Sequence, residues 1–125
     1  MIVLDSSALL AMLKREPGAD AVQAKLTEAA ITAVNVAEIL TKVSDWNLDA
    51  NAYLKNLIAL PMEFVDFGLA LAVIAGRLRA ATRGFGLSLG DRACLALAME
   101  RNCAVLTADR NWAKLNLGIP IQLIR

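Results

Sequence analysis

The stretch Met1–Leu13, MIVLDSSALLAML, changes from a strand-like apolar run to a helical pattern around a single acidic residue, Asp5. An aspartate in this position can cap the helix that follows, because its side-chain oxygen accepts an amide hydrogen of the first turn. It can also stand at the carboxyl end of a strand, where open α/β sheets usually keep their functional sites. Asp5 alone does not decide between these roles, so the rest of the chain must supply companions for it.

Short runs enriched in β-branched and aromatic residues alternate along the chain with helical patterns. The strand-like runs are MIVLD, AITAV, MEFVDF, CAVLTA and IPIQLIR, at residues 1–5, 30–34, 62–67, 103–108 and 119–125. The helical patterns cover residues 7–15, 19–29, 36–46, 49–60, 68–83 and 88–102. This alternation predicts an α/β fold, a three-layer α/β/α sandwich with a mainly parallel sheet.

The composition indicates one domain, residues 1–125, with more apolar surface than one small core requires. Apolar residues make up 58% of the chain, above the roughly 45–50% expected of soluble domains, which favours a homodimer or a permanent partner. The apolar stretch at residues 67–76 is about half the roughly 20 residues of a membrane span, so no membrane partner is expected. Asp5 interrupts the first apolar run too early for a secretion signal, so a cytoplasmic protein is expected.

The chain contains no histidine and two cysteines. The absence of histidine excludes serine–histidine and cysteine–histidine nucleophile pairs as well as histidine-based zinc sites. Cys94 and Cys103 fall in apolar segments and are interpreted as core thiols without a disulfide. Any acid–base or metal chemistry must therefore come from carboxylates. The net charge of +1 neither requires nor forbids a nucleic-acid partner, because local clusters of Lys and Arg decide that.

Three acidic residues qualify as companions of Asp5 at one edge of the expected sheet: Glu38 in NVAEIL, Asp91 in SLGDRACLALA and Asp109 in VLTADRNW. Strand ends and the helix starts that follow them share one edge of a parallel sheet, so all four acids can converge there. Each also has a structural explanation. Asn35-x-x-Glu38 and Ser88-x-x-Asp91 have the spacing of a capping box, and Asp109 suits an Asx turn. Four coincident caps are less expected than one shared site.

Carboxylates a few ångströms apart repel each other by about 1–4 kcal/mol per pair at effective dielectric constants of about 80 to 20. A fold that gathers four of them therefore indicates a bound cation. Without histidine, the oxygen donors favour Mg²⁺ or Mn²⁺ over zinc. Magnesium keeps several water ligands and binds phosphate oxygens, which points to phosphodiester chemistry.

The motifs resemble the PIN-domain family, and most closely its VapC-type toxins from prokaryotic toxin–antitoxin pairs. MIVLDSSALLAML is similar to the N-terminal segment of the family, with Asp5 as the first acid and Ser6 or Ser7 as the neighbour that helps to place it. NVAEIL and SLGDRACLALA are similar to the segments that carry the second and third acids, Glu38 and Asp91.

VLTADRNW is similar to the fourth family segment, with Thr107 and Asp109 in the family's positions. The four motifs occur in the family's order and cover essentially the whole chain. One departure is Asn111, because many relatives carry a further acid or a histidine at that point. Asn111 can orient a water or a phosphate but brings no charge, so the number of metal ions, one or two, stays open.

The resemblance implies an Mg²⁺- or Mn²⁺-dependent endoribonuclease, the toxin of a type II toxin–antitoxin pair, that cleaves RNA phosphodiesters with an activated water. It implies Asp5, Asp91 and Asp109 as metal ligands. Glu38 would bind through water or help to deprotonate the nucleophile. The resemblance also implies a cognate antitoxin that covers the active-site groove, together with a homodimer.

An acidic pocket that binds RNA needs positive charge on its rim. Arg77, Arg79 and Arg83 cluster near the loop Gly84-Phe85-Gly86, where a mobile segment beside the site would be useful. The same arginines equally suit the solvated end of an apolar helix. Other candidates for RNA binding are Lys14, Arg15, Arg92, Arg110 and Lys114.

Three other functions compete with the ribonuclease interpretation. A haloacid-dehalogenase-like phosphatase also begins with a strand-end aspartate, but it normally needs a second aspartate two residues on, where this chain has Ser7. A receiver-like phosphoacceptor module would use Asp5 beside a phosphorylated acid, but the usual paired acids and functional lysine are missing. A non-catalytic binding module would use the acids only as helix caps.

Overall fold

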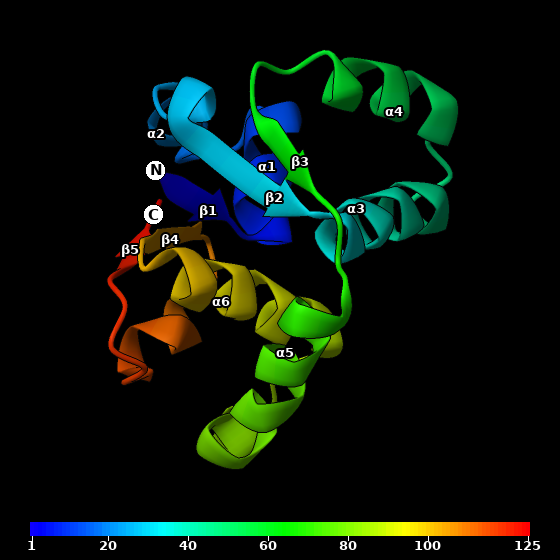
Figure 1. The fold of residues 1–125 in the computed structure, drawn as a ribbon. Helices are drawn as coiled ribbons and strands as arrows, with labels where there is room; N and C mark the ends of the chain where they lie inside the picture. Colours follow the sequence, from blue (N-terminus) through cyan, green and yellow to red (C-terminus); the bar gives the residue numbers. More distant parts are fainter.

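The first strand of the chain, β1, lies at the centre of a five-stranded sheet in the computed structural model, which describes residues 1–125 (Figure 1). The strand order is β3-β2-β1-β4-β5. All neighbouring pairs are parallel, and Ile2 of β1 lies beside Ala29 and Ala104. The strands are β1 Ile2–Leu4, β2 Ala29–Thr32, β3 Glu63–Val65, β4 Ala104–Thr107 and β5 Ile121–Leu123.

Helices connect every pair of consecutive strands. The α-helices are α1 Ser6–Leu13, α2 Ala19–Gln23, α3 Ala33–Asp45, α4 Ala50–Ile58, α5 Leu69–Thr82 and α6 Leu89–Arg101. The 3-10 helices are η1 Leu26–Glu28, η2 Arg83–Phe85 and η3 Arg110–Lys114. None of these helices combines the length and the apolar character that crossing a membrane requires.

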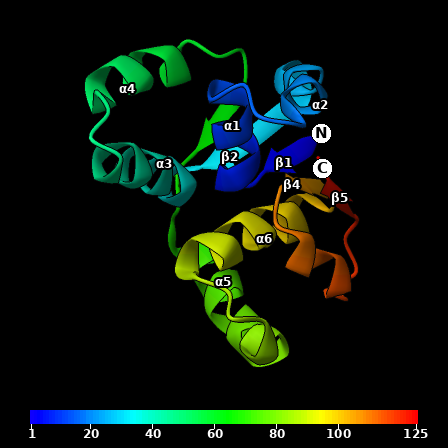
Figure 2. The same ribbon diagram turned by 180° about the vertical axis from the view of Figure 1, so that it is seen from behind.

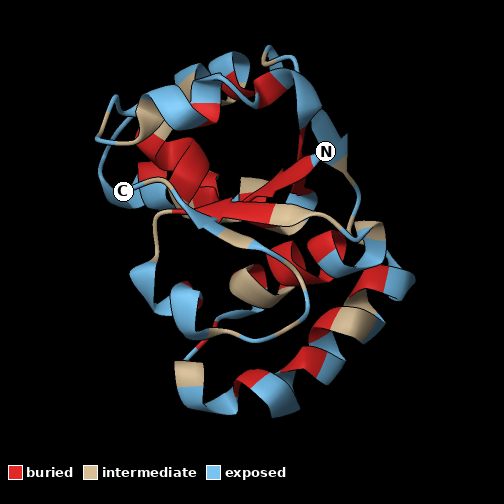
Figure 3. Cartoon of the chain, turned by 90° about the vertical axis from the view of Figure 1, so that its left-hand side faces the viewer, coloured by how far each residue is buried: buried red, intermediate tan, exposed pale blue.

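The side chains of β1 divide the core into two clusters. Ile2 and Leu4 belong to one cluster and Val3 to the other, because successive strand residues point to opposite faces of the sheet. Helices α1 to α4 supply the first cluster, and α5 and α6 supply the second (Figures 1 and 2). Figure 3 shows the buried residues on the strands and on parts of the surrounding helices. The predicted three-layer α/β/α sandwich is confirmed.

The predicted helix over residues 19–29 is wrong in its second half. α2 ends at Gln23, and the chain turns into η1 before β2 begins at Ala29. Of residues 19–28, only Val22 and Leu26 are buried, so little apolar contact supports a longer helix. In addition, Ala29 must already be extended because it pairs with Ile2 of β1.

The capping box predicted at Asn35 and Glu38 is also wrong. β2 ends at Thr32, two residues before the expected end of the strand, and α3 begins at Ala33. Thr32 is the N-cap, and its hydroxyl oxygen accepts the backbone amide of Asn35 at 3.2 Å. The earlier helix start places Asn35 and Ile39, which are four residues apart, on the same buried face of α3.

The chain reverses its direction across the sheet at β1. From β1 it continues to β2 and β3 on one side, and it then returns to β4 on the other side of β1. In open parallel sheets such a reversal creates a crevice at the carboxyl ends of the two strands concerned. Residues that follow β1 and β4 therefore border this crevice.

Candidate active site

Asp5 stands at the end of β1, and its backbone amide donates to Leu106 O of β4 at 3.0 Å. It occupies the N-cap position of α1, but its carboxylate accepts no backbone amide of that helix. Its two hydrogen bonds come instead from hydroxyl groups, Ser7 Oγ at 2.6 Å and Thr107 Oγ1 at 2.9 Å, and both end on Oδ2. Asp5 is therefore a buried carboxylate, 4% exposed, whose other oxygen has no protein donor.

Ser7 and Thr107 connect Asp5 to the segment that follows β4. Ser7 Oγ accepts the amide of Ala108 at 2.9 Å, and Thr107 Oγ1 accepts the amide of Asp109 at 3.0 Å. Each hydroxyl thus accepts from the backbone after β4 and donates to the carboxylate after β1. One hydrogen-bonded network therefore joins the two strand ends that border the crevice.

Glu38 lies on α3 and is held by two polar side chains. Ser6 Oγ donates to Glu38 Oε1 at 2.7 Å, and Asn35 Nδ2 donates to the same oxygen at 2.9 Å. The two serines after β1 consequently serve different acids. Ser7 contacts Asp5, whereas Ser6 contacts Glu38.

The carboxylates of Asp91 and Asp109 bind backbone amides near their own positions. Asp91 forms the predicted capping box, because its amide donates to Ser88 Oγ at 3.1 Å and its Oδ2 accepts the Ser88 amide at 2.9 Å. Asp109 Oδ1 accepts the amide of Asn111 at 3.0 Å, which is the predicted Asx turn. Asn111 itself is exposed. For these two acids the capping geometry is confirmed, and one oxygen of each carboxylate stays without a hydrogen bond.

The charges of neighbouring acids act on Asp5 and on Asp91. Burial raises the pKa of Asp5 to about 6, its two hydroxyl hydrogen bonds act in the opposite direction, and the charges of Asp91 and Glu38 raise the pKa further. Burial also raises the pKa of Asp91, with additional increases from Glu38 and Asp109. None of the four forms an ion pair with Lys or Arg. The crevice is therefore a concentration of carboxylates without a basic partner.

The four carboxylates do not converge on a single point in the crevice. As the side chains lie, no group of three or more acidic or cysteine side chains has the spacing of a metal site. Cys94 and Cys103 are free thiols. Burial raises the pKa of both, so neither supplies a thiolate ligand at neutral pH. The donors available at the crevice are carboxylate and hydroxyl oxygens.

The structure divides the candidate basic residues between different surfaces. Arg77, Arg79 and Arg83 are exposed on α5 and η2, and none of them forms an ion pair. This segment extends away from the sheet in both views of the ribbon (Figures 1 and 2). Arg110 is exposed directly after Asp109, as is Lys114 at the end of η3.

Arg92 and Arg15 are placed differently from the exposed arginines. Arg92 follows Asp91 in α6, but its guanidinium donates to Ala75 O of α5 at 3.0 Å and is partly buried. Arg15 lies beyond the end of α1, and this eight-residue helix separates it from Asp5 by about 12 Å. The structure therefore does not bring Arg15 to the acids, and the same holds for its neighbour Lys14.

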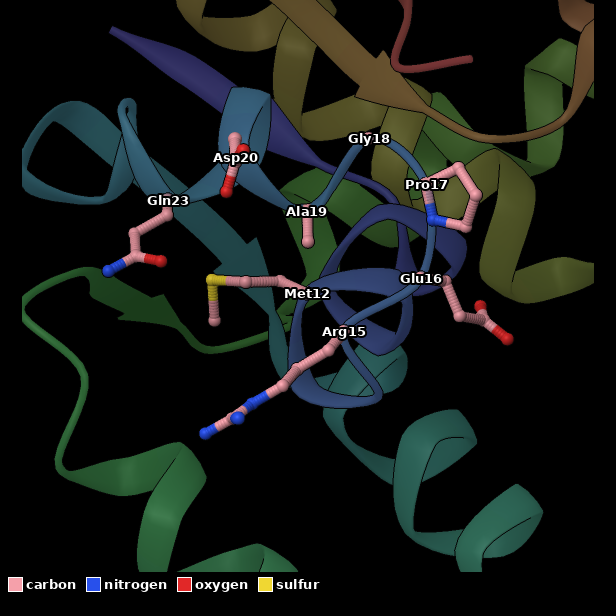
Figure 4. A pocket seen from close by; sticks show the side chains of 8 residues that line it. All are labelled: Met12, Arg15, Glu16, Pro17, Gly18, Ala19, Asp20 and Gln23. Atoms are coloured by element: carbon pink, nitrogen blue, oxygen red, sulfur yellow. The ribbon is translucent and has the colours of Figure 1, made fainter.

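Two hollows open on the surface, and the smaller one adjoins the acids. The larger, about 610 Å³, lies at the turn between α1 and α2, and Arg15 borders it (Figure 4). The smaller, about 510 Å³, lies between α3 and the start of α6, with Glu38, Ser88 and Gly90 in its lining. Glu38 is the only one of the four acids that lines either hollow.

The sequence patterns do not identify Asn35 and Gly90 as functional residues, although both contact Glu38. Asn35 is fully buried and donates to Gly90 O at 3.0 Å in addition to Glu38. A Cβ atom at Gly90 would overlap the Glu38 carboxyl group. The available signals are a polar residue in the apolar run AITAVNVAEIL and a glycine in the first turn of a helix.

The fold and the acids define a parallel α/β domain with a carboxylate site at the point where the strand order reverses. A family model described as the PIN domain matches residues 2–117. The chain belongs to the PIN domain family, as the sequence resemblance predicts. Comparison with curated protein sequences gives no significant match.

Solved structures with the same fold include toxin–antitoxin complexes. The DNA-bound VapBC from Salmonella typhimurium is 16% identical, with a TM-score of 0.75 over 99% of this chain and 98% of that chain. VapBC2 from Rickettsia felis, bound to a promoter DNA fragment, is 19% identical, with a TM-score of 0.75 over 98% of each chain. VapBC-5 from Mycobacterium tuberculosis is 26% identical, with a TM-score of 0.59 over 98% of this chain and 96% of that chain.

Proposed function

We propose that this PIN domain is a metal-dependent endoribonuclease that acts as the toxin of a type II toxin–antitoxin pair. The observation that carries the proposal is the set of four carboxylates around one crevice, from four different elements, with no Lys or Arg paired to any of them. Like charges in such a partly buried cluster destabilise the fold unless a cation is bound. Neighbouring structures that are VapBC complexes support the toxin assignment.

The donor atoms of the crevice fit Mg²⁺ or Mn²⁺. Asp5, Asp91 and Asp109 each keep one carboxylate oxygen that has no hydrogen bond, and these residues would hold the ion. Hard divalent cations prefer such oxygen ligands, and no histidine or thiolate competes for a softer metal. When bound, the ion supplies positive charge against the phosphate oxygens and makes water a better nucleophile.

The protein side chains contribute positioning and proton transfer. Ser7 and Thr107 fix Asp5 through Oδ2, so that Oδ1 is the oxygen available for binding. Glu38 is fixed through Oε1, and its Oε2 can accept a proton from the attacking water. Asn111 lies beside Asp109 and offers an exposed amide for a phosphate or a water.

The basic arm, defined as Arg77, Arg79 and Arg83 on α5 and η2, supplies the surface for the RNA backbone. Residues 67–90 contain no acidic residue, so these three arginines are the only charges in that segment. All three are exposed and free of ion pairs. A run of unpaired arginines favours phosphate contacts. Arg110 is exposed directly after Asp109 and completes the proposed RNA surface, to which Arg92 contributes only the part of its guanidinium that Ala75 O leaves accessible.

Replacing all three arginines of the basic arm by alanine is expected to weaken RNA binding about tenfold or more. The slope of binding against salt concentration should also fall by about 2, since each phosphate contact with a single strand contributes about 0.7. Filter binding of a labelled RNA at several salt concentrations measures both quantities. The matched control replaces Arg15, Lys25 and Lys55, which are exposed on the other helical layer. Equal losses in the two triple variants would contradict the assignment of the arm.

Exposed apolar side chains support a protein partner. Leu69 is 82% exposed and Ile58 is 62% exposed, and Trp46, Leu48 and Leu89 are also exposed. Trp46, Leu48 and Ile58 lie on or next to α3 and α4, whereas Leu69 and Leu89 begin α5 and α6. We assign these contacts to a cognate antitoxin and to a second copy of the chain. Co-purification with an antitoxin and the mass of the free protein in solution test the two assignments separately.

The function is tested with the purified chain, a pool of structured RNA, and either Mg²⁺, Mn²⁺ or a chelator. Cleavage is expected with either metal and not with the chelator, together with Mn²⁺ binding in a calorimetric titration. Absence of both binding and cleavage at millimolar metal would instead favour a binding module whose acids are helix caps. Phosphorylation by a small phosphodonor, lost when the acids are replaced, would favour the phosphoacceptor alternative.

A further inference from the structure

We propose that Asn35 and Gly90 are positioning residues that hold the Glu38 carboxylate in one orientation, with Oε1 bound by the protein and Oε2 beside α6. The inference rests on the proposed function, because it concerns the same carboxylate site. Neither residue carries a charge, and neither is among the acids that the sequence motifs identify.

Asn35 connects three elements through one buried amide group. It is fully buried, and its Nδ2 lies 3.1 Å from Ser6 Oγ, 2.9 Å from Glu38 Oε1 and 3.0 Å from Gly90 O. Ser6 begins α1, Glu38 is on α3, and Gly90 is in the first turn of α6. A single side chain therefore fixes the spacing of the three helix starts around the crevice.

The chemistry of its neighbours fixes the orientation of the Asn35 amide. An ionised carboxylate and a backbone carbonyl only accept hydrogen bonds, so the group that faces Glu38 and Gly90 must be the donor, Nδ2. The amide oxygen Oδ1 then accepts from Thr32 Oγ1, which lies at 2.6 Å. Glu38 and Gly90 thus select one orientation, the hydroxyl groups of Ser6 and Thr32 fit it, and the amide cannot flip without losing the two buried hydrogen bonds to Glu38 and Gly90.

The Glu38 carboxylate is held by hydrogen bonds to one oxygen and by close packing against Gly90. Its Oε1 receives both hydrogen bonds, from Ser6 at 2.7 Å and from Asn35 at 2.9 Å. The rest of the carboxyl group lies over Gly90, where a Cβ atom would overlap it. Glycine at position 90 therefore provides the space that the carboxylate occupies, directly before Asp91. The Glu38 carboxylate packs against the backbone of α6 at Gly90, and this contact places Glu38 next to Asp91.

Gly90→Ala is the principal test, because alanine favours the helix while it displaces Glu38. The gain in helix propensity offsets part of the cost of displacing Glu38 from its hydrogen bonds, so the variant is expected to remain folded with a small change in melting temperature. The RNA cleavage rate should fall about 10- to 100-fold with the KM for RNA nearly unchanged, and the Mn²⁺ affinity measured by calorimetry should fall less, because Asp5, Asp91 and Asp109 stay in place. Gly76→Ala on α5 is the matched control, since a Cβ atom there meets nothing within 4 Å. A Gly90→Ala variant that cleaves and binds Mn²⁺ like wild type would overturn the proposal.

Asn35→Ala should lower the same two quantities by a similar factor, and it should also lower the melting temperature. Because both residues act through Glu38, the double variant should cleave RNA about as fast as the less active of the two single variants. Independent, multiplying losses would contradict a common action through Glu38.

A stability cycle separates failure of this inference from failure of the proposed function. The melting temperature is measured for wild type, Gly90→Ala, Glu38→Ala and the corresponding double variant. Alanine at position 90 should stabilise more when the Glu38 carboxyl group is absent. This coupling needs neither metal nor RNA, so it tests the contact even if wild type neither binds Mn²⁺ nor cleaves RNA. Absence of coupling would overturn the inference, whereas absence of cleavage in wild type would overturn the proposed function.

Discussion

Asp5→Asn is expected to reduce metal-dependent RNA cleavage by about a thousandfold or more while leaving the fold intact. The substitution removes the charge of Asp5 but preserves its shape. The amide oxygen of asparagine can still accept the hydrogen bonds that Ser7 and Thr107 donate to Oδ2. The loss therefore reports on the charge at the crevice and not on the hydrogen-bonded network around it.

The variant Asp49→Asn is the matched control for Asp5→Asn. Asp49 is an exposed N-cap aspartate whose Oδ1 accepts the amides of Asn51 at 3.0 Å and Ala52 at 3.2 Å. Asparagine caps a helix about as well as aspartate, so cleavage should be unchanged. Cleavage of a labelled RNA in Mg²⁺ and in Mn²⁺ compares the two variants. Full cleavage activity of Asp5→Asn with either metal would contradict the assignment of Asp5 to the active site.

The metal-free protein is expected to lose stability, relative to Asp5→Asn, as the pH rises from about 4 to about 7. The pKa of Asp5 is about 6 in the folded chain, against an ordinary value of 3.8. The folded state therefore binds this proton more tightly than the unfolded state. The stabilisation is complete below about pH 4 and disappears as the pH rises through 6. The difference between the two pKa values of Asp5 corresponds to a stabilisation of the folded state of about 3 kcal/mol at most.

Urea unfolding in the presence of a chelator, at pH 4 and at pH 7, measures this effect. The two proteins should have similar free energies of unfolding at pH 4, and Asp5→Asn should be the more stable at pH 7. Asp49→Asn should follow wild type at both pH values. Mn²⁺ at pH 7 should then stabilise wild type and not Asp5→Asn, because only a state that binds the ion gains from it. Parallel pH curves for wild type and Asp5→Asn would contradict the burial of a charged Asp5.

The sequence predicts the layer architecture because its short strands and amphipathic helices alternate regularly. It also predicts which acids share an edge of the sheet, since Asp5 and Asp109 directly follow strands whose carboxyl ends meet. The start of α3 could not be fixed in this way. Thr32 and Asn35 are both good capping residues, and the β-branched Val34 and Val36 suit a strand as well as a helix. Tertiary burial of Asn35 decides in favour of Thr32 as the cap.

The details of the candidate site depend on contacts that no local pattern contains. Ser6 and Ser7 are adjacent and chemically identical, yet they bind different acids because α1 turns their side chains in different directions. Gly90 contacts Glu38, 52 residues earlier, through the absence of a side chain. Such an absence has no signature in a sequence without knowledge of the packing around it. The pairings of the site had to come from the three-dimensional structure.

The crevice is assembled from both sides of the sheet, because Ser6 and Glu38 belong to one helical layer and Gly90 and Asp91 to the other. During translation the ribosome releases Asp5 and Glu38 long before α6 and β4 exist. A nascent or truncated chain therefore carries half of the acids and cannot complete the site. The proposed ribonuclease activity would therefore arise only after α6 and β4 have joined the sheet.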